Sequence, residues 1–497
     1  MTGKMLARLM LLFGASLFLL VVQSANNNNN VCPGLEHGTP PSGQEAVPDA
    51  ATYDAALKAL DLQAVVADLQ LLMTTSQECW PADFGHYGPL FVRLAWHCSG
   101  SFRSTDGRGG CGGGRQRFEP ERSWADNTNL DKARGLLWPV KEKFGDGLSW
   151  GDLFTLAGTT AIKSMGGPVT EYCAGRVDDP DGSESEILGP SPEQERDAPC
   201  EIDGKCQKPL GATTLGLIYV NPEGPVAQDE DGKWVPDPNP TRSAADIRDA
   251  FGRMGLSDEQ TVALIGGGHA FGKAHGACPA GAGPSPAEQV SNPWPGLCGS
   301  GKGNETFTSG FEGQWTTEPT RWNNEFFVHL RNHNWEKHMG PGGHWQWRPT
   351  NAEEGCKVAG LMRLTVDVAL VHDRKYAHIV RDFAMYPRKF DHAFDKAWFK
   401  LTTDGGYWSK ERKCISGKQI PSMRSDDDGD HLAADAVELL AVQQHSSVSP
   451  IFGVSVIFMM FGFLGMAFLL NKHVFGSHAA DDDQLLLHLA DDDLISS

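Results

Sequence analysis

Apolar residues recur every three or four positions along most of the central part of the chain, which is the helical period. In residues 51–73 this period is carried by Leu57, Leu60, Val65, Leu69 and Leu72. Similar segments follow at 88–100, 130–144, 153–165, 243–254, 257–265, 322–330, 361–371, 374–384 and 390–401. Strand-like alternation is nearly absent, so the pattern predicts an all-α fold. Two Gly- and Pro-rich segments, 176–212 and 279–314, are predicted to be long loops.

Several of these segments carry helix-terminating signals. Pro89 follows Gly88 at the expected start of one helix, and Gly100 can end it. Ser149 and Ser257 precede two others in the pattern of a capping box. The glycine-rich stretch 106–114 follows a helix and has no Gly-Lys-Ser/Thr ending, so we interpret it as close backbone packing.

The helix after Pro89 carries a first set of candidate catalytic residues. Arg93, Trp96 and His97 are three or four positions apart and therefore share a face. An imidazole beside a guanidinium suits peroxide chemistry, because one group moves a proton while the other stabilises developing charge. Taken singly, such residues more often complete a packed helix. Cys98 follows directly and is expected to remain a thiol.

A second candidate group lies in the later half. His269 follows three glycines at a helix end, and these glycines would let the backbone pass close to a flat ligand. Asp367 interrupts an otherwise apolar helical segment, where a carboxylate needs a partner. Pairing Asp367 with one ring nitrogen of His269 would satisfy both groups and strengthen the imidazole as an iron ligand. The alternative is a structural histidine.

Both ends of the chain differ from its centre. Residues 1–25 resemble a signal peptide, and the uncharged run 451–470 is long enough for a membrane helix. The predicted organisation is a signal peptide at 1–25, a linker at 26–50, a domain at 51–404, a linker at 405–449, a span at 450–471 and an acidic cytosolic tail at 472–497. This describes a single-pass type I membrane protein with a lumenal or extracellular domain. A secondary plastid reached through the secretory route is the alternative destination.

Charge and cysteine usage add two constraints. The net charge of −20 disfavours a nucleic-acid partner. All eleven cysteines precede the predicted span, where disulfides are permitted, and the odd number leaves at least one without an intrachain partner. Cys200 and Cys206 are the expected pair. The sequence does not predict the oligomeric state.

Six segments taken together resemble a known family. They cover residues 89–127, 130–158, 215–225, 247–276, 308–322 and 390–401. They are similar to the N-terminal, haem-bearing domain of catalase-peroxidases, in the class I haem peroxidase superfamily. The resemblance extends over about residues 80–402 and implies a two-lobed helical fold with haem b between the lobes. The family's second domain is missing, which is typical of a single-domain, hybrid eukaryotic form.

The resemblance also implies roles on the peroxide-binding side of the haem. His97 would be the distal acid and base, Arg93 the distal arginine and Trp96 the distal tryptophan. Asn127 would orient His97, and Asp126 would line the access channel.

On the opposite side, the resemblance implies that His269 is the axial ligand of the haem iron. Asp367 would be its hydrogen-bond partner and Trp315 the proximal tryptophan. Ser309 falls where the family contacts a haem propionate.

Catalase activity in this family depends on a covalent Trp-Tyr-Met link, which maps here to Trp96, Tyr219 and Met254. For Tyr219 and Met254 the alternative is ordinary core filling. Asp404 stands where the family has an arginine that assists oxygen release. The resemblance therefore implies reduction of hydrogen peroxide through an oxyferryl intermediate, with catalase activity and a detoxifying role. Alternatives are a peroxidase that depends on an unidentified electron donor and lacks catalase activity, or a haem-binding membrane sensor.

Overall fold

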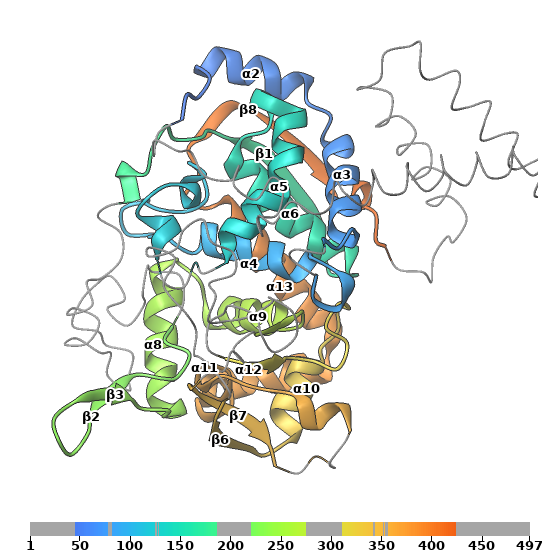
Figure 1. Cartoon of the computed structure of the whole chain (residues 1–497). Helices are drawn as coiled ribbons and strands as arrows, with labels where there is room; N and C mark the ends of the chain where they lie inside the picture. The colour runs from blue at the N-terminus through green and yellow to red at the C-terminus, as the bar shows by residue number, and fades with distance from the viewer. Residues whose placement is uncertain are drawn as a thin grey trace, which may run out of the picture. The chain divides into compact units, whose positions relative to one another are not determined.

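The structure is a computed structural model, and it describes residues 45–77, 82–124, 127, 129–185, 220–274, 311–340, 343–350, 352 and 356–423. The chain divides into two units, Met1–Arg424 and Ser425–Ser497. All described residues belong to the first unit, and they are the residues drawn in colour in Figure 1. The predicted signal peptide, membrane span and tail lie outside the described residues.

The first predicted helix is in fact two helices, α2 (Ala50–Ala59) and α3 (Leu62–Thr74). Leu60 is extended and ends α2, and the side chain of Asp61 accepts hydrogen bonds from the first backbone N–H groups of α3. An acidic residue at this position favours a new helix start over continuation. Apolar periodicity alone did not show the interruption.

Three further helices complete the first group. They are α4 (Gly88–Ser99), α5 (Leu130–Phe144) and α6 (Trp150–Ser164). Ser149 caps α6 as predicted, by accepting a hydrogen bond from the N–H of Asp152. Helices α4 and α6 pack very closely, because a Cβ atom added to Gly158 would lie 2.4 Å from the Cβ of Ala95. Helix α6 is almost wholly buried and also contacts α3 and α5.

The second group lies in the lower part of Figure 1. It contains α8 (Pro240–Arg253), α9 (Asp258–Gly268), α10 (Glu325–Asn332), α11 (Thr365–His372), α12 (Arg374–Met385) and α13 (Pro387–Thr403). The predicted capping box of Ser257 and Gln260 is present at the start of α9. Helix α8 begins three residues before the predicted start, because Asn239 is its N-cap. Helix α13 contacts both α4 and α9 and so joins the two groups.

In the described part of the chain, four small antiparallel sheets correct the purely all-α prediction. They pair β1 (Glu171–Arg176) with β8 (Trp408–Ser416), β2 (Val226–Gln228) with β3 (Trp234–Pro236), β4 (Lys273–Ala274) with β5 (Gly313–Gln314), and β6 (Trp335–Met339) with β7 (Trp345–Pro349). Most of these strands are too short to show a two-residue period in the sequence. Helices still form most of the described fold.

The β1–β8 sheet extends the folded unit beyond residue 404, where we predicted the domain to end. Cys173 and Cys414 lie opposite each other in the register and form a disulfide. Residues 405–416, which we assigned to a linker, are therefore part of the folded unit, as is the short helical turn Gly417–Gln419. Among the residues that the structure describes, no helix has the length and apolarity needed to cross a bilayer.

Candidate active site

Helix α4 positions the first set of predicted catalytic residues. Pro89 stands in its first turn, where the missing N–H is not needed for an intrahelical hydrogen bond. His97 is buried, whereas Arg93 and Trp96 are partly buried. The indole of Trp96 stacks on Phe251 of α8, with ring centroids 5.4 Å apart. This contact joins α4 to the second helix group.

The imidazole of His97 has a fixed orientation. Its Nδ1 atom is 2.8 Å from Oδ1 of Asn127, and Nδ2 of Asn127 donates a 2.6 Å hydrogen bond to the backbone carbonyl of Glu121. Because that carbonyl can only accept, Asn127 must present its oxygen to His97. His97 therefore carries its proton on Nδ1, and its Nε2 lone pair is left to accept a proton.

Electrostatics keep this imidazole neutral. Burial and then the nearby positive charge of Arg93 hold the pKa of His97 well below its ordinary value of 6.5, although the bond to Asn127 acts in the opposite direction. A neutral imidazole with a free Nε2 is the form that a general base requires.

The second predicted histidine is held by a carboxylate. Nδ1 of His269 is 2.8 Å from Oδ1 of Asp367, and Oδ2 of Asp367 accepts a 2.8 Å hydrogen bond from the N–H of Leu364. Asp367 is fully buried. Since an ionised carboxylate can only accept, Nδ1 of His269 is the protonated nitrogen and Nε2 keeps its lone pair. The predicted partnership between these two residues is present.

Aromatic rings fix the plane of the same imidazole. Trp315 is parallel to His269, with ring centroids 3.9 Å apart, and Phe326 approaches at 5.8 Å with its ring tilted by 64°. The structure thus brings His269, Asp367 and Trp315 together from three separate parts of the chain.

The three glycines before His269 have different roles. A Cβ atom on Gly266 would lie 2.0 Å from the ring of Phe327, and one on Gly267 would lie 2.2 Å from the ring of Phe394. These two glycines admit phenylalanine rings, which corrects our expectation that all three serve a flat ligand. A Cβ atom on Gly268 would meet no atom within 4 Å in the described part of the chain beyond its own helix and neighbours, so of these three glycines only Gly268 borders open space there.

The two histidines occupy adjoining elements. Helices α4 and α9 contact each other, and a Cβ atom on Gly272 would lie 2.7 Å from the Cβ of Pro89. The positive φ of 70° at Gly272 turns the chain just after His269. The start of the helix that carries His97 is therefore packed against the segment that follows His269.

Other predicted site residues have different outcomes. Asp126, Tyr219 and Ser309 lie outside the described residues, as do Cys200 and Cys206. Met254 is buried at the end of α8, three residues after the Phe251 that stacks on Trp96. The Trp96, Tyr219 and Met254 link remains a prediction.

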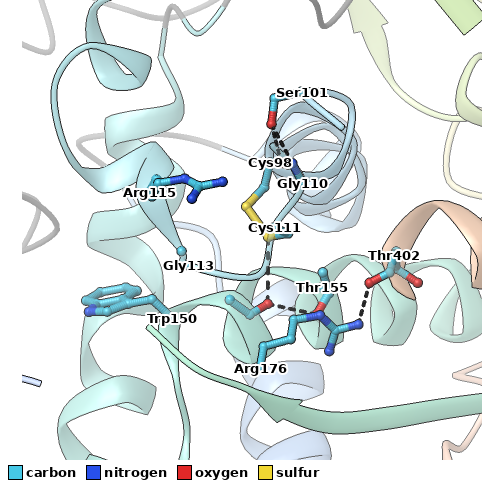
Figure 2. Close-up of a disulfide and its surroundings, with 12 residues drawn as sticks. Cys98, Ser101, Gly110, Cys111, Gly113, Arg115, Trp150, Thr155, Arg176 and Thr402 are labelled. Atoms are coloured by element: carbon cyan, nitrogen blue, oxygen red, sulfur yellow. Dashed lines mark hydrogen bonds between the residues drawn. A yellow bond between two sulfur atoms is a disulfide. The ribbon is translucent and has the colours of Figure 1, made fainter. Parts of the chain in front are cut away.

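The prediction for Cys98 is wrong, because Cys98 and Cys111 form a disulfide (Figure 2). The glycine-rich stretch turns back toward α4 and brings the two Cα atoms to 4.8 Å. Sequence reasoning missed this bond, since a separation of 13 residues does not reveal the path of a loop. It also missed Glu121 and Phe251, although Phe251 precedes Met254 by one helical turn.

Two sites carry side chains of the types that hold a metal or a cofactor. Glu171, Cys173 and Cys414 lie close together, but both sulfur atoms belong to a disulfide and no thiolate remains. His269 is better suited, because Asp367 fixes its tautomer and Nε2 is left as a donor. An imidazole of this kind, beside the open space at Gly268, fits the axial ligand of a haem.

Comparisons with known proteins show the family of this chain. Residues 73–386 match the family described as "Peroxidase". Curated relatives include catalase-peroxidases of Salinibacter ruber, 47% identical over 70% of this chain, and Escherichia coli, 48% identical over 72% of it. The Saccharopolyspora erythraea catalase-peroxidase is 50% identical over 70% of this chain.

The matched region has a clear limit. In each of these three relatives it covers 49% of the relative's own length, so the chain spans about half the length of the curated relatives it matches. The matched family nevertheless covers more than half of this chain and includes both His97 and His269. The chain belongs to the peroxidase family and is similar to catalase-peroxidases.

Proposed function

We propose that this protein is a haem b peroxidase that reduces hydrogen peroxide. The observation that carries the proposal is the pair of oriented imidazoles, His97 held by Asn127 and His269 held by Asp367, in a chain of the peroxidase family. Haem bound at His269 would supply the electrons that cleave the O–O bond. The protein residues then have to bind the cofactor, move protons and stabilise charge.

On the distal side, His97 takes a proton from hydrogen peroxide at Nε2 and returns it to the departing oxygen, so that water leaves. Its depressed pKa keeps Nε2 unprotonated at neutral pH. Arg93 acts on the same reaction, because its guanidinium is close enough to influence His97 and can stabilise negative charge on the departing oxygen. Trp96, stacked on Phe251, forms an aromatic wall of the site.

On the proximal side, the chain fixes one ligand. Asp367 accepts a hydrogen bond from Nδ1 of His269 and makes Nε2 a stronger electron-pair donor. Trp315 restricts rotation of the imidazole through its parallel stack. These contacts fix the direction of Nε2, which would hold the iron of a bound haem.

The source of the reducing electrons separates two forms of this function. In the first, a second hydrogen peroxide is oxidised to O2 with the help of a Trp96-Tyr219-Met254 link, and two peroxides give O2 and two waters. The protein would then remove peroxide as a catalase-peroxidase. In the second, an external donor of unknown identity supplies both electrons. The ion pair of Asp404 with Lys400 favours the second form, because it places a carboxylate and not a free arginine at that turn.

The location of the protein is part of the proposal. We infer entry into the secretory pathway through residues 1–25 and a type I anchor at 450–471. Two disulfides in the described part of the chain support an oxidising compartment, since such bonds are rare in the cytosol. Protease protection in intact vesicles tests this, because a lumenal domain stays intact until detergent is added. Digestion without detergent would contradict it.

The activity is tested with the haem-loaded protein and hydrogen peroxide in stopped-flow and oxygen-electrode experiments. His97→Ala should slow the reaction with peroxide by about 10²- to 10⁴-fold, which is the usual contribution of general acid–base catalysis. Wild-type speed in this variant would overturn the assignment of His97. Oxygen release without a donor would establish the catalase form, whereas peroxide consumption only with a donor would establish the alternative.

A further inference from the structure

The Cys98–Cys111 disulfide lies directly beside the distal histidine. Cys98 follows His97 on α4, and Cys111 lies in the glycine-rich loop, which we define as residues 106–114 (Figure 2). Both cysteines are only 1% exposed. A bond that is shielded in this way is poorly placed for exchange with soluble thiols, which favours a structural role at the site.

The glycine-rich loop has few side chains with which to hold itself in place. Cβ atoms on Gly110 and Gly112 would lie 2.9 Å and 2.5 Å from the backbone of residues 404–407, so the loop is pressed against that segment as bare backbone. On the α4 side the loop is held by the disulfide, by the hydroxyl of Ser101, which accepts a 2.9 Å hydrogen bond from the N–H of Gly110, and by Arg103, which forms an ion pair with Asp106. The disulfide is thus the covalent connection between α4 and this loop.

The same loop leads directly into the residues that support Asn127. Arg115 follows it, and its guanidinium donates to Asp179 at 2.9 Å and lies 3.7 Å from the carboxylate of Glu121. Arg115 and Glu121 are each 1% exposed. Burial raises the pKa of Glu121, and Arg115 and the hydroxyl of Ser185, 2.6 Å away, oppose that effect. Glu121 is therefore held in place in part by Arg115, the residue that follows the loop.

Two connections link His97 to the glycine-rich loop. One connection is covalent and runs from His97 through Cys98 to Cys111. The other runs from the loop through Arg115 and Glu121 to Asn127, whose Oδ1 accepts a hydrogen bond from Nδ1 of His97. A change in the distance between α4 and the loop therefore strains or breaks the hydrogen bond that orients the imidazole.

We propose that Cys98 and Cys111 are positioning residues for His97, and that their disulfide sets the spacing between α4 and the loop that supports Asn127. This inference rests on the proposed role of His97 as the distal base. Without the bond, the imidazole loses its fixed orientation and water gains access to it. Since misplacement of a catalytic group by about 1 Å can cost 10²-fold, we expect a loss in the peroxide reaction of about 10- to 100-fold.

The chain provides a matched control. The Cys173–Cys414 disulfide also joins distant parts of the chain, but it links β1 to β8, and neither cysteine belongs to the two connections between His97 and the loop. We therefore compare Cys98→Ser/Cys111→Ser with Cys173→Ser/Cys414→Ser in the haem-loaded protein. Both variants should unfold at a lower temperature. Only the first should slow the reaction with peroxide.

Two readouts separate positioning from general stability. The acidic limb of the rate–pH profile should move to higher pH in the Cys98/Cys111 variant. Water around His97 weakens the effect of burial, which is the largest cause of its low pKa and outweighs the smaller, opposite effect of a weakened bond to Asn127. Modification of His97 by diethyl pyrocarbonate, followed by mass spectrometry, should become at least several-fold faster. The control variant should resemble the wild type in both measurements.

Equal pH profiles and equal His97 modification in the two variants would overturn the proposal and leave the Cys98–Cys111 bond a stabilising link only. If the serine variant does not fold, Cys98→Val/Cys111→Ala, which fills the site with apolar groups, is measured in its place. Failure of the proposed function is recognised separately. In that case His97→Ala reacts with peroxide at the wild-type rate, while the modification experiment still reports whether the disulfide orients His97.

Discussion

The imidazole of His269 and the indole of Trp315 are parallel, with ring centroids 3.9 Å apart. Asp367 holds the edge of the same imidazole through Nδ1, so the ring is fixed both in its plane and in its rotation. The imidazole of His97 is fixed instead by the neutral amide of Asn127. The partner of His269 is a carboxylate, whereas the partner of His97 is a neutral amide. This difference suits an electron-rich iron ligand at His269 and a neutral base at His97.

Replacement of Asp367 by Asn should weaken the proximal side. An amide cannot accept hydrogen bonds from both His269 Nδ1 and the N–H of Leu364, so one buried donor loses its partner at a cost of about 1–3 kcal/mol in unfolding free energy. The iron–histidine stretching frequency of the reduced haem protein, measured by resonance Raman spectroscopy, should fall. Asp373→Asn is the control, because that carboxylate caps α12 and pairs with Arg248. An unchanged frequency in Asp367→Asn would contradict the proposed ligand arrangement.

The pH dependence of the reaction should reflect the state of His97. Its pKa lies well below 6.5, so the rate with peroxide should stay constant from neutral pH to below 6.5 before it falls. The hydrogen bond from His97 to Asn127 raises that pKa, so Asn127→Ala should move the acidic limb to still lower pH while slowing the reaction by about tenfold or more. Asn324→Ala, which affects an asparagine bonded to α12 carbonyls, is the control. A shift to higher pH in Asn127→Ala would contradict this account.

Alanine substitutions in the glycine triplet should separate packing from cofactor binding. Gly267→Ala forces a methyl group into the ring of Phe394 and should cost about 1–3 kcal/mol in unfolding free energy. Gly268→Ala meets no such neighbour, so the haem-free protein should keep its stability. If the open space at Gly268 receives the haem, this second variant should bind haem more weakly. Thermal unfolding and haem titration measure the two effects, and equal haem affinity in Gly268→Ala and wild type would place the cofactor elsewhere.

Strand β8 should be necessary for the domain. A chain of residues 45–404 lacks this strand, which leaves the edge of β1 unpaired and Cys173 without its disulfide partner. A chain of residues 45–423 keeps both. We expect cooperative thermal unfolding, measured by circular dichroism, in the longer chain and a much lower transition temperature in the shorter one. Equal transition temperatures would show that the domain ends near residue 404.

Local signals in the sequence predicted many of the helices and the identities of the proposed catalytic residues. The spacing of Arg93, Trp96 and His97 places them on one helix, and a carboxylate in an apolar helix, Asp367, requires a partner. Capping serines 149 and 257 likewise act within one turn, so the sequence alone locates them. Such features depend on residues three or four positions apart, and their energetics are contained in the local chain.

Only the tertiary structure decided the features that depend on contacts between residues far apart in the sequence. The pairing of β1 with β8, the disulfide between Cys98 and Cys111, and the placement of Phe rings against Gly266 and Gly267 join residues whose sequence spacing carries no signal. Each depends on the path of the chain between the partners. The sequence thus determined which groups can perform the chemistry, whereas the packing of distant segments determined how those groups are held, because orientation depends on neighbours that only the folded chain brings together.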